Sequence, residues 1–533
     1  MMATPRCLLV LRQVLPCALG GTGVSPVRPP NHGQDARATH KTTVERPLVP
    51  LVAALVLSVF GTCGEAAAAE RLNVLFLAAD DLRNDLGCYG HPLAKTPNLD
   101  GLAERGTLFE RAYCQQALCN PSRASIMTGL RPDTLGIWDL PTHFREVRPD
   151  VVTLPQWFKQ HGYFTQNIGK VFHNWRQEIH GDPDSWSVPA VMHYATHDSD
   201  KPQVEGELPP NLAKARRTEC RDVPDGAYFD GRIAAGAVEA LRKAKERGRP
   251  FFLAIGFWKP HLPFNAPKRY WDLYDRAQIT PAPNPTPPEG CPAVALHDSR
   301  ELLGVPGRPP RPGRPSGPLS DDEIVELRHG YLAGVSFLDA QVGKLLDELD
   351  RLDLSRRTVV VFWADHGFHL GEHGLWCKTS NFELDARVPL IIARPKGKAQ
   401  RARTDALAEL LDLYPTLVEL CGLPTPQGLD GVSLAPVLDD PAASVKPAAF
   451  TQHPRPAYYR GEPQTMGVSA RTPRFRYTEW RDFATGRVVA RELYDHAVDP
   501  DENRNVIDAP PDRAGLEEAS RLLERTFPRR GYR

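Results

Sequence analysis

Acidic residues follow two apolar runs of the sequence, at the points where these runs end. Asp80 and Asp81 come after the first run, and Asp365 with His366 comes after the second. Adjacent carboxylates repel, so both stay ionised only if a cation or several donors lie between them. Considered alone, the first pair is explained as well by a turn or a helix cap. Brought together, the two groups offer an oxygen-rich ligand set that favours Ca²⁺ or Mg²⁺ over Zn²⁺.

A second reactive group is the run Cys119-Asn120-Pro121-Ser122-Arg123. Pro121 is favourable in the first turn of a helix, which places Cys119 at the positive end of the helix dipole, where backbone N–H groups attract anions. Arg123 lies one turn further and can direct its guanidinium group to the same anion. A structural thiol beside a surface arginine explains the pentapeptide equally well when it is considered alone.

The combination of these groups resembles the formylglycine-dependent sulfatase family. Cys-x-Pro-Ser-Arg is the family's signature for a cysteine that is oxidised after synthesis, and here it occurs together with Asp80-Asp81 and Asp365-His366. The resemblance covers nearly everything from Arg71 to the C-terminus, and within the family the chain is most similar to the iduronate-2-sulfatase branch. The supporting segments are 79–83, 86–90, 131–134, 169–173, 259–261, 370–374 and 466–469.

The resemblance implies a metal site and a modified nucleophile. Asp80, Asp81, Asp365 and His366 would bind Ca²⁺ together with Cys119, which would be present as 3-oxoalanine (formylglycine).

The resemblance also implies the other catalytic residues. Arg123 and Lys170 would hold the hydrate of the aldehyde, His173 would contact one of its hydroxyl groups, and His261 and Lys378 would bind the sulfate and serve the leaving oxygen. The Gly-Lys-x-x-His spacing departs from the shorter form of many sulfatases but fits the iduronate branch. Taken singly, each histidine could be a core residue and each lysine a solvated charge. The occurrence of all these residues in the family's order favours a site.

The chemistry of a sulfate monoester agrees with these roles. Its sulfur is surrounded by negative oxygens and its sugar alkoxide is a poor leaving group, so a catalyst needs clustered cations and an acid at the bridging oxygen. One hydroxyl of a hydrated aldehyde can attack sulfur while the other is kept for releasing sulfate. An unmodified cysteine or a serine has no second hydroxyl.

Apolar runs typical of strands buried on both faces alternate with helical patterns. The expected strands are 73–79, 251–257, 358–364 and 388–393, and the expected helices are 98–105, 153–161, 230–247, 321–352 and 404–420. The alternation predicts an α/β fold with a large, mostly parallel sheet flanked by helices, and such sheets place their sites directly after the strands. The resemblance implies the alkaline-phosphatase-like sulfatase fold.

The chain is expected to have four parts. Residues 1–45 lack periodicity and are expected to be an unstructured extension, or to precede the true start of translation. Residues 46–70 have a cationic start, a short apolar run and small residues, which is the layout of a secretory signal peptide. Residues 71–445 are expected to form the catalytic domain, and residues 446–533 a smaller C-terminal subdomain with an antiparallel sheet and a helix over 512–525.

Proline is over-represented, with 52 residues in a chain of 533, about twice the usual share of roughly 5%. The proline-rich stretch 276–320 has no periodicity, and it is predicted to be a surface excursion of the catalytic domain.

Charge and hydropathy limit the partners and the location. The 65 Lys and Arg residues balance the 65 Asp and Glu residues, so a nucleic-acid-binding surface is not expected. The apolar run of the predicted signal is too short for a comfortable bilayer span. Export to the periplasm or the extracellular space is therefore expected, with no stable membrane span after signal cleavage.

These inferences predict an exported, Ca²⁺-dependent sulfuric ester hydrolase. Its expected substrate is a sulfated carbohydrate, more specifically 2-O-sulfated uronic acid units of a polysaccharide or oligosaccharide. A formylglycine-generating or other sulfatase-maturing enzyme is an expected partner. The nearest alternative is a phosphomonoester or phosphonate hydrolase of the alkaline phosphatase superfamily, and the alternative from another class is an inactive carbohydrate-binding protein whose Cys119 is not modified.

Overall fold

The computed structural model describes residues 71–173, 181–193, 217–304, 318–395 and 401–532. The predicted extension 1–45 and signal peptide 46–70 lie outside the described residues, as do residues 305–317 of the proline-rich stretch. Within the described part, no helix combines the length and the apolar character needed to cross a lipid bilayer.

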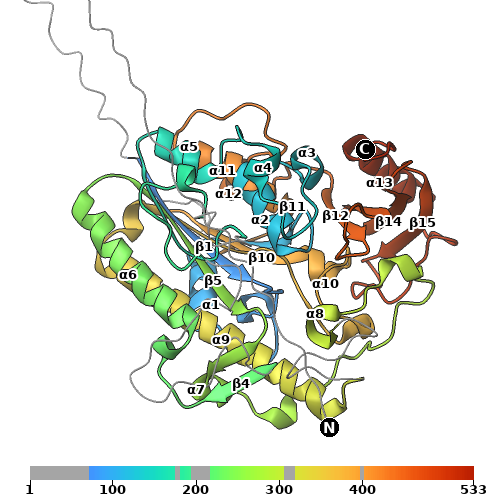
Figure 1. Ribbon diagram of the computed structural model, residues 1–533, viewed down its shortest axis with the longest axis horizontal. Helices are drawn as coiled ribbons and strands as arrows, with labels where there is room; N and C mark the ends of the chain where they lie inside the picture. The colour runs from blue at the N-terminus through green and yellow to red at the C-terminus, as the bar shows by residue number, and fades with distance from the viewer. Residues whose placement is uncertain (1–70, 174–180, 194–216, 305–317, 396–400, 533) are drawn as a thin grey trace, which may run out of the picture. The chain divides into compact units, whose positions relative to one another are not determined.

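A seven-stranded sheet in the order β11-β2-β10-β7-β1-β5-β3 forms the centre of the fold (Figure 1). The strands are β1 Asn73–Asp80, β2 Thr107–Tyr113, β3 Phe164–Gly169, β5 Phe251–Pro260, β7 Thr358–Ala364, β10 Arg387–Ala393 and β11 Ala402–Glu409. All run parallel to one another except β10, which is antiparallel to both of its neighbours. The predicted α/β class with a mostly parallel sheet is confirmed.

The central strands form because their sequences are apolar almost without interruption. Every residue of β1, β5 and β7 is buried, as expected for strands with helices on both faces. β1 lies between the other two, with Leu75 opposite Leu253 on one side and Val360 on the other. All four predicted strands are present.

The single antiparallel strand has a local cause. After β7 the chain forms β8 (His369–Leu370), β9 (Trp376–Cys377) and helix α10 (Glu383–Ala386). This excursion ends where it began, because the N–H groups of Gly367 and Phe368 donate to the carbonyls of Asp385 and Leu384. β10 therefore enters the sheet at the edge where β7 leaves it and runs in the opposite direction.

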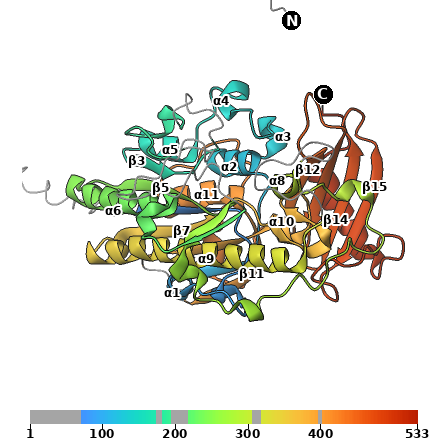
Figure 2. The same ribbon diagram turned by 60° about the horizontal axis from the view of Figure 1, so that its bottom comes forward.

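Helices cover both faces of the sheet (Figures 1 and 2). Helices α1, α6 and α9 pack together on one face, and α2, α5 and α11 pack on the other. The helices are α1 Pro97–Glu104, α2 Cys119–Thr128, α3 Pro132–Leu135, α4 Phe144–Val147, α5 Leu154–Gln160, α6 Phe229–Arg247, α7 Lys268–Trp271, α8 Arg300–Leu303, α9 Asp321–Arg351, α11 Leu413–Leu420, α12 Ala435–Asp439 and α13 Arg513–Thr526. Four of the five predicted helices are present as α1, α5, α6 and α9.

The fifth predicted helix, 404–420, is wrong in its first half. β11 occupies the segment up to Glu409, and α11 begins only at Leu413. β11 pairs in parallel with β2, with Thr404 opposite Phe109 and Ala408 opposite Ala112. The exposed edge of β2 offers backbone hydrogen bonds to this segment, and these outweigh the helix propensity of its alanines and leucines.

A separate antiparallel sheet follows in the C-terminal part. Its order is β12-β13-β14-β15, with β12 Ala449–Arg455, β13 Thr465–Arg471, β14 Phe475–Asp482 and β15 Val488–Asp495. Helix α13 packs against β13 and β14 and begins at Asp512, whose side chain accepts a hydrogen bond from the N–H of Gly515. The predicted antiparallel sheet and terminal helix are present.

The described part of the stretch 276–320 runs mostly at the surface, as predicted, but a few of its side chains are buried. Ala295 and Leu302 are buried, and the side chain of Ser299 accepts a hydrogen bond of 2.9 Å from the backbone N–H of Trp376. Frequent prolines remove periodicity from this stretch, but single apolar and polar side chains still attach it to β9.

Two glycines allow the ends of β3 and β5 to approach closely. Gly169 has a φ of 82°, and a Cβ atom at this position would lie 2.0 Å from the carbonyl oxygen of Gly256. A Cβ atom at Gly256 would lie 2.0 Å from the carbonyl oxygen of Lys170. A side chain at either position would therefore displace the backbone that carries Lys170.

Replacing Gly169 by alanine should lower the free energy of unfolding by about 1–3 kcal/mol, because the methyl group meets backbone rather than a movable side chain. The matched control is Gly101→Ala in α1, where nothing lies within 4 Å of the new Cβ atom. That change should stabilise the protein by about 0.5–1 kcal/mol. Denaturant unfolding measures both, and equal effects of the two substitutions would contradict the close approach.

Candidate active site

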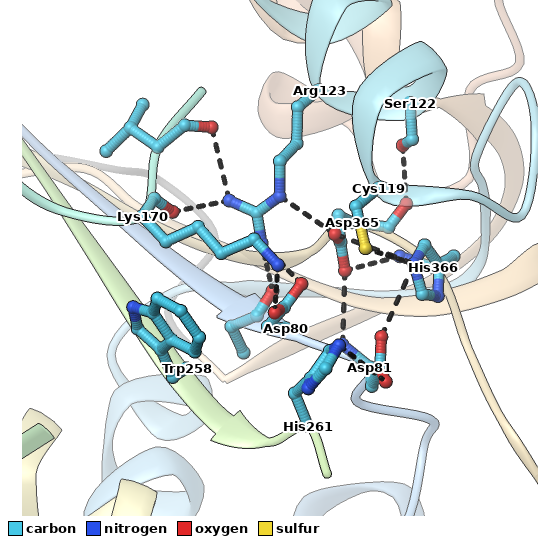
Figure 3. Close-up of polar contacts among 12 residues, drawn as sticks. Asp80, Asp81, Cys119, Ser122, Arg123, Lys170, Trp258, His261, Asp365 and His366 are labelled. Atoms are coloured by element: carbon cyan, nitrogen blue, oxygen red, sulfur yellow. Dashed lines mark hydrogen bonds and ion pairs between the residues drawn. The ribbon is translucent and has the colours of Figure 1, made fainter. Parts of the chain in front are cut away.

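The predicted site residues lie at the carboxyl edge of the main sheet, where parallel sheets bind their ligands. Figure 3 labels all of them except His173 and Lys378. They come from the end of β1 (Asp80, Asp81), the residues after β3 (Lys170, His173), after β5 (His261), after β7 (Asp365, His366) and after β9 (Lys378), and from the first turns of α2 (Cys119, Arg123). All are buried except His261, which is partly buried. The structure thus brings together residues that are far apart in the sequence.

Asp80 organises one pair of cations. Lys170 forms an ion pair with Asp80 through its Nζ atom, and Arg123 donates from Nη2 to Asp80 Oδ1 at 3.0 Å. Arg123 also donates from Nε to Asp365 Oδ2 at 2.8 Å. Burial alone would raise the pKa of Asp80, but Lys170 and Arg123 hold it well below its usual value. Asp80 is therefore a carboxylate at neutral pH.

Asp81 contacts a second pair of nitrogen-bearing side chains, Lys378 and His261. Lys378 Nζ lies 3.0 and 2.8 Å from the two carboxylate oxygens of Asp81, and His261 Nε2 lies 3.8 Å from Oδ2. Asp81 has a φ of 61°, a left-handed conformation that aspartate tolerates better than most residues. The adjacent carboxylates Asp80 and Asp81 thus contact two different pairs of side chains, Lys170 with Arg123 and Lys378 with His261.

Cys119 opens helix α2, as the sequence predicts. Its Sγ atom lies 3.4 Å from Nε2 of His366 (Figure 3), and Ser122 one turn further donates a hydrogen bond of 2.5 Å to the carbonyl of Asp365. Burial raises the pKa of the Cys119 thiol well above its usual value, in spite of Lys170 nearby. The sulfur is therefore a neutral thiol, which is a poor nucleophile.

His366 presents a ring nitrogen to the carboxylates. Its Nδ1 atom lies 3.0 Å from the carbonyl oxygen of Gly367, which accepts the Nδ1 proton and leaves the lone pair on Nε2. Nε2 lies 3.4 Å from Asp81 Oδ1 and 3.6 Å from Asp365 Oδ2. This hydrogen bond orients the ring as in many metal-binding histidines.

These donors fit a divalent metal ion. One ligand atom each from Asp80, Asp81, Cys119 and His366 lie within 4.8 Å of one another. Burial raises the pKa of Asp365 even though Arg123 opposes the shift, so this carboxylate is short of positive charge. A divalent cation would supply that charge, and the oxygen-rich ligands are those of a hard ion.

Packing interactions hold the lysine and histidine side chains in place. Lys170 Nζ lies 5.4 Å from the ring centroid of Trp258, a cation–π contact. The backbone N–H groups of Trp258 and Lys259 both donate to Asp230 at 2.9 Å, and Lys259 Nζ donates to the carbonyl of His261 at 2.9 Å. The chain is therefore fixed on both sides of the turn that carries His261.

His173 is buried in the same region. Burial, together with the positive charge of Lys170, lowers its pKa well below the usual value. His173 is therefore a neutral imidazole, which can exchange hydrogen bonds with a bound hydroxyl group without adding charge.

The sequence analysis missed one residue of the site, Glu301 in α8. Its Oε1 atom lies 2.9 Å from Lys378 Nζ and 3.2 Å from His261 Nε2. Glu301 falls in the proline-rich stretch, where no periodicity or motif marks it. Its only signal in the sequence is a glutamate among buried apolar residues, which is too common to identify a site.

Cavities elsewhere in the described chain do not include these residues. One cavity of about 700 Å³ is lined by several arginines, among them Arg403 and Arg474. These two are paired with Glu110 and Asp495, so the charges at this surface are largely neutralised.

The carboxylates, the buried thiol at a helix N-terminus and the basic side chains Arg123, Lys170 and Lys378 are those of a hydrolase site for an anionic ester. Comparison with known proteins gives its family. The sequence profile described as Sulfatase matches residues 72–423. The chain belongs to the sulfatase family and is an enzyme that hydrolyses sulfate esters. The family generally uses formylglycine and a divalent metal ion.

Individual relatives agree with this assignment. The chain is 36% identical to iduronate 2-sulfatase of Mus musculus, and the match covers 82% of this chain and 91% of the relative. A second profile, described as N-sulphoglucosamine sulphohydrolase, C-terminal, matches residues 371–525.

Solved structures share the fold at lower identity. BT4656 in complex with its substrate D-glucosamine-2-N,6-O-disulfate has a TM-score of 0.67 and 24% identity, over 86% of this chain and 98% of that chain. The phosphonate monoester hydrolase of Silicibacter pomeroyi also has a TM-score of 0.67, with 23% identity. The match covers 86% of this chain and 96% of that chain. The predicted sulfatase fold is confirmed.

Replacing Asp81 by asparagine should weaken the binding of a divalent ion by at least about tenfold, because ligand charge sets the affinity of such sites. Asparagine also tolerates the left-handed backbone at this position, so the fold should be kept. Isothermal titration calorimetry of the metal-free protein measures the affinity. The control is Asp350→Asn, which removes an exposed ion pair with Arg105 and should leave the affinity unchanged; unaltered binding in Asp81→Asn would exclude this residue as a ligand.

Proposed function

We propose that this sulfatase is an exported, Ca²⁺-dependent enzyme that removes the 2-O-sulfate from uronic acid units of a sulfated polysaccharide or its fragments. Cys119, present as formylglycine, is the nucleophile in this proposal. The observation that carries it is the joint placement of Cys119, the acidic pair Asp80-Asp81 and the two pairs of side chains that contact these carboxylates at one edge of the sheet.

The charge balance of the cluster supports a bound divalent ion. The carboxylates of Asp80, Asp81, Asp365 and Glu301 outnumber the permanent cations Arg123, Lys170 and Lys378, so the cluster alone would repel a sulfate ester. Ca²⁺, held by Asp80, Asp81, Asp365, His366 and the oxidised Cys119, would reverse this charge and stabilise the sulfate oxygens, while the hydrated aldehyde would supply the attacking hydroxyl.

Arg123 and Lys170 act on the nucleophile side of the site. Both are fixed by Asp80, so little reorganisation is needed to present their N–H groups to a charged oxygen at residue 119. The neutral His173 accepts or donates a hydrogen bond to a hydroxyl at the same place.

His261 and Lys378 act on the leaving-group side. Their Nε2 and Nζ atoms bind the sulfate oxygens, and one of them donates a proton to the bridging oxygen as its bond to sulfur breaks. Such a proton donor contributes typically about 10²–10⁴-fold to a rate, and a sugar alkoxide needs one because it is a poor leaving group.

Similarity to iduronate 2-sulfatase supports the sugar specificity. The identity of 36% extends over 82% of this chain and 91% of the relative. The proposal further includes export through the segment 46–70, to the periplasm or the extracellular space, and a sulfatase-maturing enzyme that oxidises Cys119.

Peptide mass spectrometry of the native protein should find residue 119 as the aldehyde, with a lower mass than the cysteine form. Cys119→Ser and Cys119→Ala should both lose multiple turnover and keep the fold, since neither supplies two hydroxyl groups on one carbon. Cys421→Ala, which removes a buried thiol of the sheet-and-helix core, is the control. An active enzyme with an ordinary cysteine at residue 119 would refute the mechanism; an inactive one that still binds the sugar would favour the carbohydrate-binding alternative.

The matured enzyme should cleave 2-O-sulfated uronate disaccharides at least about 10²-fold better, in kcat/KM, than the same sugars sulfated on the glucosamine unit. Since a phosphonate monoester hydrolase shares the fold, phenyl phosphonate esters are the second comparison. Preference for the phosphonate would establish the alternative function, and turnover of unrelated sulfate esters only would refute the sugar specificity.

A further inference from the structure

Glu301 joins Lys378 and His261, the two side chains of the leaving-group side. Its Oε1 atom accepts from Lys378 Nζ at 2.9 Å and lies 3.2 Å from His261 Nε2. Lys378 Nζ contacts Asp81 at 2.8 Å on its other side. One carboxylate oxygen of Glu301 therefore fixes the relative positions of the two groups that face the leaving oxygen.

The local structure holds Glu301 in this place. α8 begins after Ser299, which has a φ of 50° and accepts a hydrogen bond from the N–H of Trp376, two residues before Lys378. The Tyr458 hydroxyl, from the segment after β12, donates to Glu301 Oε2 at 3.4 Å. The carboxylate is thus attached to the strand that carries Lys378 and to the C-terminal part of the chain.

A carboxylate in this position opposes the binding of an anionic substrate. The negative charge of Glu301 weakens the attraction between the site and the sulfate group of the substrate. The presence of Glu301 therefore needs another explanation. Asp81, His261 and Glu301 present ligand atoms within 4.8 Å of one another, but Lys378 Nζ contacts both carboxylates and already supplies a positive charge there. The contacts therefore favour the orientation of Lys378 and His261 as the role of Glu301.

We propose that Glu301 is a positioning residue for the sulfate-ester reaction, which keeps Lys378 Nζ and His261 Nε2 directed at the bridging oxygen of the substrate. The inference rests on the proposed function. When a divalent ion binds Asp81, the carboxylate of Asp81 is shared between the ion and Lys378. Glu301 is then the remaining counter-ion of Lys378 and keeps its Nζ atom from moving toward the metal ligands. Glu301 acts through these two side chains and does not touch the reacting atoms.

The test is Glu301→Gln in the matured, Ca²⁺-loaded enzyme. We expect kcat for the sulfated sugar to fall by about 10²-fold or more, which is the contribution of an oriented proton donor. Binding of inorganic sulfate, measured by isothermal titration calorimetry without turnover, should stay the same or tighten because a negative charge is removed. This split between kcat and anion affinity is not expected from a merely structural residue, whose loss would weaken both.

The matched control is Glu409→Gln, because Glu409 also holds two cations, Arg131 and Lys446, but outside the site. Its kcat should stay within about threefold of the wild type, even if its stability falls. Glu301→Asp keeps the charge and should recover part of kcat. If the glutamine variant does not fold, kcat and sulfate affinity of Glu301→Asp are compared with those of the wild type instead.

The inference is overturned if kcat of Glu301→Gln is close to that of the wild type, or if kcat and sulfate affinity fall together. Wild-type enzyme that hydrolyses no sulfate ester would instead refute the proposed function, so the two failures are distinguishable.

Discussion

The site depends on the buried guanidinium group of Arg123. It contacts Asp80 at the end of β1, Asp365 at the end of β7 and the carbonyl groups of Lys170 and Val171 after β3. Arg123 and both carboxylates are fully buried. Removing one partner of such a buried ion pair strongly destabilises the folded protein. One side chain from α2 thereby fixes the relative positions of three strand ends.

In this arrangement two adjacent carboxylates contact different side chains. Asp80 and Asp81 follow each other in the chain but hold different cations, and the left-handed backbone at Asp81 is part of that separation. Lys170 and Arg123 contact Asp80, whereas Lys378 and His261 contact Glu301. In the proposed mechanism, the nucleophile and the leaving group are thus served by different groups, which can be altered independently.

The sequence predicted the parts of the fold and the site that have a strong local signal. Continuous apolar runs identified β1, β5, β7 and β10, and the motif around Cys119 identified the start of α2. β2 and β3 were not predicted, because Glu110 and Arg111 interrupt the one and Gln166 and Asn167 the other. Only neighbouring strands, which the sequence does not display, make these segments extended.

The same limit applies to the site. The predicted acidic pair, thiol, lysines and histidines occur in recognisable motifs, and the structure brings them together. Glu301 is placed at the cluster by its neighbour Ser299. The side chain of Ser299 accepts a hydrogen bond from the backbone N–H of Trp376 in β9, 77 residues further along the chain. Contacts of this range are decided by tertiary packing, as is the strand β11, whose residues alone favour a helix.

The burial of Cys119 determines when its sulfur can be oxidised. The residue is 3% exposed, and every residue of α2 around it is buried. A second protein therefore cannot bind this segment in the folded enzyme. In the proposed mechanism, conversion of Cys119 to the aldehyde therefore comes before the chain folds, while the segment is still accessible. A producing cell would need its oxidising enzyme present during synthesis or translocation, and enzyme added afterwards to folded material would come too late.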